Sequence, residues 1–202
     1  MNDLSQMQWE REKWFLFPYY PKDSELANDV TEQILHFKQN RAFAVQRVIH
    51  LAIQAFKQAE YDFRDNYYCR YLIALPPHEA GQQNRPCEAL CAALADHFSW
   101  LQHLPRALER IETVPKSSTA RKEGRERTDY ETHLRSISYA GPPIDATGQG
   151  IILIDDIYTN GATSDACYGI IKDAIRCEHV IGFFVGKTRR LSRAPLTKVH
   201  EG

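Results

Sequence analysis

The residues with the clearest capacity for chemistry lie between Ile151 and Ser164. A run of four apolar residues, Ile151–Ile154, precedes two adjacent carboxylates, Asp155 and Asp156. A short turn follows, made of hydroxyl, amide and small residues: Thr159, Asn160, Gly161, Ala162 and Thr163. An apolar run that ends in a polar turn and then enters a helical pattern predicts a buried strand, a loop and a helix start.

The two halves of this segment suit two parts of one ligand. A helix start offers unpaired backbone N–H groups and the positive end of the helix dipole, and Gly161 allows a close backbone approach. With hydroxyl donors from Thr159, Thr163 and Ser164, this half favours a phosphate. The two carboxylates would repel a bare phosphate, so they suit sugar hydroxyls, a divalent cation or a developing positive charge. A phosphorylated ribose satisfies both halves. The alternative is an acidic strand end that caps a helix and binds nothing.

Alternating strands and helices must position this segment. Apolar residues at helical spacing predict a helix from Val45 to Phe56, and Asp23 or Ser24 is expected to cap a shorter helix before it. Strands are predicted at 71–75, 134–139, 151–154 and 180–185, with helices carrying Cys87 and Cys91 on one buried face and Cys167 on another. This alternation favours right-handed crossovers and an α/β fold with a mainly parallel sheet flanked by helices. We expect residues 1–66 to form an N-terminal helical hood and residues 67–202 to form the core.

Composition excludes several classes of protein. Hydrophobic residues make up 43% and charged residues 25%, and no apolar run approaches the length needed to span a bilayer, so no membrane partner is expected. The formal net charge of −1 gives no global attraction to nucleic acid, and the basic C-terminal tail is small. The five cysteines have neither zinc spacing nor an even number for disulfides, which fits a reducing cytoplasm. The first residues lack a secretory leader pattern.

The Ile151–Ser164 segment resembles the signature of type I phosphoribosyltransferases that binds 5-phosphoribosyl 1-pyrophosphate (PRPP). The resemblance implies that Asp155 and Asp156 hold the 2′- and 3′-hydroxyls of ribose and act in catalysis. It also implies that Thr159, Asn160, Gly161, Ala162 and Thr163 hold the 5′-phosphate. Asn160 departs from the small residue common at its position, although its amide can still donate a hydrogen bond.

Two further segments resemble the pyrophosphate side of the same family. The loop after the strand at 71–75 contains Pro76, Pro77 and His78, where the family binds pyrophosphate; two prolines also end a strand without binding anything. A charged stretch, 116–127, lies where the family has a loop that closes over PRPP and excludes water. Its candidates for reaching pyrophosphate are Lys116, Arg121 and Arg125, whereas a solvated surface loop is the simpler interpretation.

Most of the chain from Trp14 onward loosely resembles ComF-like, competence-associated members of the family, although the N-terminal zinc ribbon is missing. The resemblance implies transfer of 5-phosphoribosyl from PRPP to a nitrogen acceptor, a base or an amine, with release of pyrophosphate. It implies Mg²⁺ as the cofactor, held mainly by PRPP itself and in part by Asp155 and Asp156. Dimers are common in the superfamily, so a homodimer is one expectation. Two alternatives stay open: a non-catalytic PRPP or nucleotide sensor, and an accessory protein of DNA uptake.

Overall fold

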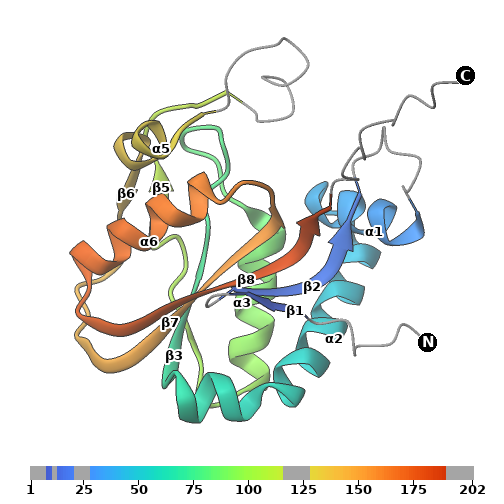
Figure 1. Cartoon of the computed structure of the whole chain (residues 1–202), viewed down its shortest axis with the longest axis horizontal. Helices are drawn as coiled ribbons and strands as arrows, with labels where there is room; N and C mark the ends of the chain where they lie inside the picture. Colours follow the sequence, from blue (N-terminus) through green and yellow to red (C-terminus); the bar gives the residue numbers. More distant parts are fainter. Residues whose placement is uncertain (1–7, 11–12, 21–27, 116–127, 190–202) are drawn as a thin grey trace, which may run out of the picture.

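A six-stranded sheet forms the centre of the computed structural model, which describes residues 8–10, 13–20, 28–115 and 128–189 (Figure 1). The strands are arranged in the order β1-β2-β8-β7-β3-β4. All neighbouring strands are parallel except β1 and β2. Their bounds are β1 Gln8–Glu10, β2 Lys13–Tyr19, β3 Cys69–Ala74, β4 Gln102–His103, β7 Ala146–Tyr158 and β8 Cys177–Thr188. The predicted mainly parallel sheet is therefore confirmed.

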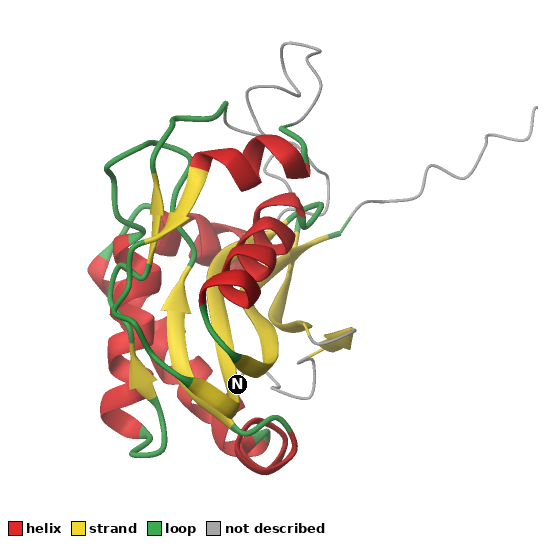
Figure 2. Ribbon diagram, turned by 90° about the vertical axis from the view of Figure 1, so that its left-hand side faces the viewer, coloured by secondary structure: helices red, strands yellow, loops and turns green. Residues whose placement is uncertain are grey.

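Helices cover both faces of the sheet (Figures 1 and 2). On one face lie α1 (Asp29–Lys38), α2 (Ala42–Gln58) and α3 (Arg85–His97), and a π-helical turn, η2 (Asp62–Asn66), leads from α2 toward β3. On the other face lies α6 (Ala162–Ala174), beside α5 (Tyr130–Ser136) and a small antiparallel sheet of β5 (Leu108–Arg110) and β6 (Ile137–Tyr139). The expected helices on both sides of the sheet are thus present.

The apolar residues of β7 explain why this strand lies inside the sheet. Ile152 and Ile154 are fully buried in the cluster with α1, α2 and α3, whereas Ile151 and Leu153 are buried in the cluster with α6. Successive side chains of a strand point to opposite faces, and a parallel sheet covered on both faces needs apolar residues at every position. The continuous apolar run in the sequence is the pattern that such a strand requires.

Two expectations about element boundaries change. The strand predicted at 134–139 is only Ile137–Tyr139, because Asp129 Oδ1 accepts a hydrogen bond from the Thr132 amide at 2.8 Å and caps α5, which extends to Ser136. The helix start expected at Asp23 or Ser24 lies outside the described residues. In the described part, α1 begins at Asp29 after the N-cap Asn28.

The N-terminal segment contributes to the sheet as well as to the helical hood. Strand β2 pairs with β8 in parallel, and α1 and α2 pack over the sheet through a cluster that joins Phe56 to Phe183. The division of the chain at residues 66 and 67 stays a prediction.

None of the helices in the described part has the length and apolar character needed to cross a membrane.

Candidate functional site

The chain diverges between β3 and β7, the two neighbouring strands at the middle of the parallel sheet. After β3, helix α3 leads to β4 on one side; after β7, helix α6 leads to β8 on the other side and on the opposite face. The last backbone hydrogen bond between the two strands joins the Leu75 amide to the Ile154 carbonyl at 2.8 Å. Ligands of open α/β sheets bind in the crevice at such a switch point, beyond the carboxyl ends of the strands.

The turn between β7 and α6 leaves several backbone N–H groups without a hydrogen-bond acceptor in the described chain. Gly161 is the N-cap of α6 and has φ 88°. This is a left-handed backbone conformation that residues other than glycine adopt only at a cost in free energy. Thr159 and Asn160 are exposed. Among the described residues, no acceptor is found for the amides of Gly161, Thr163 and Ser164, and the Ala162 amide has only a 3.5 Å contact with Asn160 Oδ1. The turn therefore has donors available for an anion.

One predicted donor is already used. The hydroxyl of Ser164 is buried and donates to the Gly161 carbonyl at 2.8 Å, so it closes the turn. The Thr159 hydroxyl makes a long contact, 3.4 Å, with Asn160 Oδ1. The Thr163 hydroxyl, at the start of α6, contacts the side chain of His133 from α5.

Asp155 and Asp156 lie at the end of β7, which continues through both residues to Tyr158. Because strand side chains alternate, the two carboxylates point toward opposite faces of the sheet. Asp155 is half-buried and accepts a hydrogen bond from Asn84, which precedes α3, at 3.3 Å. Asp156 is buried and forms an ion pair with Lys38 at 2.9 Å. Asp155 is thus held from the start of α3 and Asp156 from the end of α1.

Electrostatics distinguish Asp155 from an ordinary surface carboxylate. Burial, together with the negative charge of Asp156, raises the pKa of Asp155 well above its usual value. The positive charge of Lys38 and the hydrogen bond from Asn84 act in the opposite direction. A cation or a set of sugar hydroxyls in contact with Asp155 would favour its charged form, and carboxylates with perturbed pKa values are typical of functional sites.

Lys38, at the end of α1, is a charged partner that the sequence did not single out. It lies 118 residues before Asp156 along the chain, and its side chain is about half exposed. Burial, the largest single influence, lowers the pKa of Lys38, but the charge of Asp156, its hydrogen bond and the charge of Asp155 together raise the pKa above its ordinary value. The hood therefore supplies a cation directly to the predicted sugar-binding carboxylate.

Replacing Lys38 with methionine is expected to lower the free energy of unfolding, because Asp156 stays buried without its cation. Since the folded pKa of Lys38 lies above the ordinary lysine value of 10.5, the pairing stabilises the fold fully below pH 10.5 and is lost as the pH rises through the folded pKa. The loss in Lys38→Met should therefore be constant up to about pH 10 and shrink above it.

Urea unfolding of both proteins over this pH range measures the difference. Lys57→Met is the matched control, since Lys57 is exposed in the last turn of α2 and forms no ion pair with any residue of the described chain. A loss of stability equal in the two variants at every pH would contradict a specific role for the ion pair between Lys38 and Asp156.

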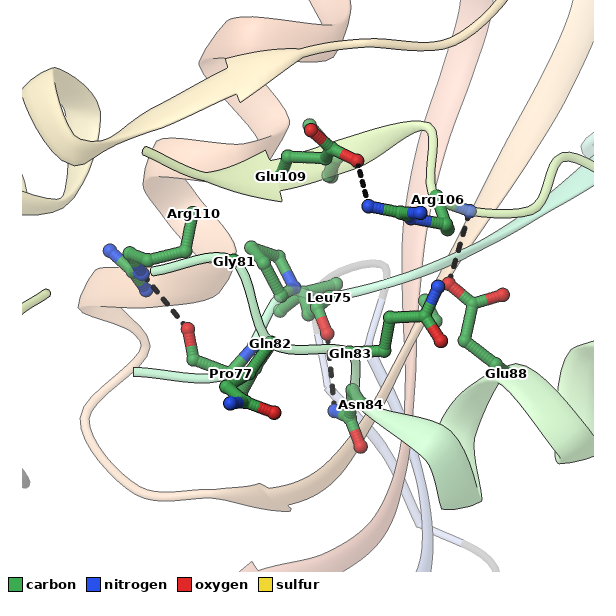
Figure 3. Close-up of a pocket in the computed structure, with 13 residues that line it drawn as sticks. Leu75, Pro77, Gly81, Gln82, Gln83, Asn84, Glu88, Arg106, Glu109 and Arg110 are labelled. Carbon is green, nitrogen blue, oxygen red and sulfur yellow. Dashed lines mark hydrogen bonds and ion pairs between the residues drawn. The ribbon is translucent and has the colours of Figure 1, made fainter. Parts of the chain in front are cut away.

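The proline loop follows β3 beside the end of β7, where the Leu75 amide donates to the Ile154 carbonyl. Pro76 and Pro77 line a cavity of about 20 Å³, room for about one water molecule, together with residues of the β5 strand (Figure 3). The Pro77 carbonyl accepts a hydrogen bond from Arg110 Nε at 2.9 Å, and His78 Nε2 lies 3.1 Å from Glu79 Oε1. All peptide bonds of the described residues are trans. The loop is therefore held in place by β5 through Arg110.

The predicted lid candidates Lys116, Arg121 and Arg125 lie outside the described residues. The two ends of that segment are described, and they meet: the Thr128 hydroxyl donates to the Pro115 carbonyl at 3.4 Å. The Val114 amide donates to the His78 carbonyl at 2.9 Å, which fixes one end beside the proline loop. The described residues on either side of the basic segment therefore lie near the proline loop.

Sequence reasoning missed two buried residues that connect the proline loop to the β7–α6 turn. Arg110 of β5 is only 3% exposed and His133 of α5 only 5% exposed. Arg110 reaches the proline loop through Pro77, and His133 reaches the β7–α6 turn through Thr163. Their separation of 23 residues matches no motif, so the sequence carried no signal for the pair.

The carboxylates of the site have the donor type that Mg²⁺ prefers, oxygen. Within the described ranges, no group of three His, Cys, Asp or Glu residues is arranged to hold a metal ion. Asp155 and Asp156 are therefore the residues at this end of β7 with oxygen atoms suited to a cation.

Comparison with solved structures gives a distant resemblance, whereas the other comparisons give none. No protein-family model matches the chain, and no curated protein matches it. Among solved structures, it resembles adenine phosphoribosyltransferase from Saccharomyces cerevisiae, crystallised with an imino-altritol bisphosphate and adenine. The identity is 14%, the match covers 74% of this chain and 72% of that chain, and the TM-score is 0.44. A resemblance this distant does not identify a substrate.

Proposed function

We propose that this protein is a Mg²⁺-dependent phosphoribosyltransferase that moves the 5-phosphoribosyl group from PRPP to a nitrogen acceptor. The observation that carries the proposal is the end of β7, where two carboxylates stand next to a helix start with free amides. Carboxylates bind sugar hydroxyls and amides bind phosphate, so the site matches the two ends of ribose 5-phosphate. Its position at the switch point of the sheet supports the same assignment.

The binding of PRPP would divide among three elements. The amides of the β7–α6 turn, with Thr159, Asn160, Ala162 and Thr163 around Gly161, would hold the 5′-phosphate. Asp155 and Asp156 would accept hydrogen bonds from the ribose hydroxyls. The proline loop at Pro76, Pro77 and His78 would face the pyrophosphate, and Lys116, Arg121 and Arg125 would cover it.

The chain's part in the reaction follows from this placement. Departure of pyrophosphate develops positive charge on the ribose ring, and the carboxylates of Asp155 and Asp156 stabilise this charge electrostatically. The segment that carries Lys116, Arg121 and Arg125 would exclude water, which would otherwise hydrolyse the intermediate. Mg²⁺, when bound, would neutralise charge on the leaving pyrophosphate.

The acceptor is proposed to enter from the side of the helical hood. A cavity of about 230 Å³ lies between β2, α1 and α2. It is lined by both apolar and polar residues, and the buried Gln33 Oε1 next to it has no hydrogen-bond partner in the described chain. A concave pocket that combines apolar residues with polar groups suits a small ligand such as a base or an amine.

Pyrophosphate release tests the proposal. The full chain, incubated with PRPP, Mg²⁺ and a panel of bases and amines, is expected to release pyrophosphate with at least one acceptor. The turnover should depend on Mg²⁺ and disappear with excess chelator, because the leaving group needs its charge neutralised. If no compound of a broad panel supports turnover while PRPP still binds, the transferase assignment fails.

A binding-only protein that senses PRPP or a nucleotide is the second candidate. One observation favours it: both carboxylates already have partners, Asp156 with Lys38 and Asp155 with Asn84. Such partners preserve a binding site but weaken the free charge that catalysis would use. The same pyrophosphate assay, run beside a PRPP binding measurement, distinguishes the two candidates.

A further inference from the structure

We propose that Arg110 and His133 are positioning residues that force the hydroxyl of Thr163 to donate its hydrogen bond outward, to a phosphate at the start of α6. The inference rests on the proposed function, because it concerns the same phosphate. It adds two residues from outside the Ile151–Ser164 segment. It also fixes the direction of the hydrogen bond between Thr163 and the phosphate, with the hydroxyl as the donor.

The first step is the direction of the bond between Arg110 and His133. Arg110 Nη1 lies 3.2 Å from His133 Nδ1. A guanidinium has only N–H donors and stays protonated in proteins, so Nδ1 of His133 must accept and must be free of its proton. Burial and the charge of Arg110 lower the pKa of His133 to about 4, so the ring is neutral at neutral pH.

The second step follows from the neutral ring. A neutral imidazole with a bare Nδ1 carries its proton on Nε2. Nε2 of His133 lies 3.3 Å from Oγ1 of Thr163, so the ring donates and the threonine oxygen accepts. The hydroxyl hydrogen of Thr163 must then be donated elsewhere. Within the described part of the chain no acceptor for it is found, and the residue lies at the start of α6, where the free amides also point.

The surroundings of Arg110 hold the arrangement in place. Nη1 also donates to the hydroxyl of Ser136 at 2.6 Å, and that hydroxyl lies 2.7 Å from the Thr132 carbonyl. Nε donates to the Pro77 carbonyl. Arg110 is buried, yet no carboxylate of the described residues lies within ion-pair distance of it. A buried cation without a counter-ion is costly, and an anion bound nearby would compensate it.

Nuclear magnetic resonance tests the direction of the relay without any ligand. Long-range ¹H–¹⁵N spectra of the full chain at neutral pH are expected to show His133 as the Nε2–H tautomer, with the signal assigned by its loss in His133→Gln. Observation of the Nδ1–H tautomer, or of a doubly protonated ring, would overturn the proposal.

Titration with ribose 5-phosphate tests the consequence for binding. Thr163→Val is expected to weaken binding about tenfold, since a hydrogen bond to a charged phosphate is lost, whereas Thr163→Ser keeps it. His133→Leu should weaken binding severalfold in the wild-type background but not in the Thr163→Val background. His133→Gln should bind nearly as well as the wild type, because the glutamine amide can still donate to Thr163. Circular dichroism confirms that each variant is folded.

The outcomes separate this inference from the proposed function. If the wild-type protein binds ribose 5-phosphate and the His133→Leu effect is equal in both backgrounds, the relay is wrong while the proposed function survives. If the folded wild-type protein binds neither ribose 5-phosphate nor PRPP, the proposed function is wrong, and the outward donation to a phosphate is wrong with it.

Discussion

Asp156→Asn is expected to lower kcat/KM for pyrophosphate release by about a hundredfold to a thousandfold, the size of effect seen when a group that stabilises transition-state charge is removed. Asparagine keeps the shape of the side chain but carries no negative charge, so the positive charge that develops on ribose loses its nearest counter-charge. The neutral amide also leaves Lys38 without its partner. Steady-state pyrophosphate release with the accepted base or amine measures the effect.

Asp173→Asn is the matched control for this substitution. Asp173 is exposed on α6, away from the crevice edge, so its variant should keep the activity of the wild type. Thermal unfolding of both variants shows whether they are folded at the assay temperature. A folded Asp156→Asn protein with more than half of the wild-type kcat/KM would contradict the electrostatic role of this carboxylate.

Gly161→Ala is expected to weaken PRPP binding at least tenfold, because the phosphate amides depend on the left-handed turn at this residue. With φ 88°, an added Cβ strains the backbone, and it would lie 2.6 Å from the hydroxyl oxygen of Tyr158. The turn should open, and the amides of the α6 start should lose their common direction. Stability is expected to fall as well, by about 1–2 kcal/mol.

Gly148→Ala separates backbone strain from loss of the site. Gly148 also has a positive φ, 72°, but a Cβ added there would have no atom within 4 Å, and the residue belongs to the opposite end of β7. This variant should lose similar stability and keep its affinity for PRPP. Equal affinity of the two variants, measured on folded protein by calorimetry, would show that the turn at Gly161 does not hold the phosphate.

Local sequence was sufficient to predict the elements that carry the turn. The run Ile151–Ile154 is apolar at every position because β7 is covered on both faces, and this feature is visible without coordinates. The helix with Cys87 and Cys91 was predicted from its spacing, and both thiols are buried as expected. Of the strand predicted at 134–139, only Ile137–Tyr139 is a strand. The residues before it belong to a short helix that Asp129 caps, and the apolar pattern did not indicate this helix.

Contacts between distant residues could not be predicted in the same way. Lys38 reaches Asp156 and Arg110 reaches His133 only after the sheet has formed, and neither pair has a characteristic spacing in the chain. The alternation of side chains along β7 was predictable. The residues that bind each carboxylate, Lys38 for Asp156 and Asn84 for Asp155, were not. The contacts of Lys116, Arg121 and Arg125 with pyrophosphate stay predictions, since these residues lie outside the described part.

Isothermal titration of the wild-type chain with PRPP and Mg²⁺ tests most directly whether the end of β7 binds a phosphorylated ribose. We expect saturable binding of one PRPP per chain, with a dissociation constant below about 1 mM, the upper end of ordinary enzyme affinities for substrate. Ribose 5-phosphate should compete for the same site. Absence of binding heat at millimolar PRPP, in a sample shown to be folded, would contradict the assignment of this turn to the sugar and its phosphate.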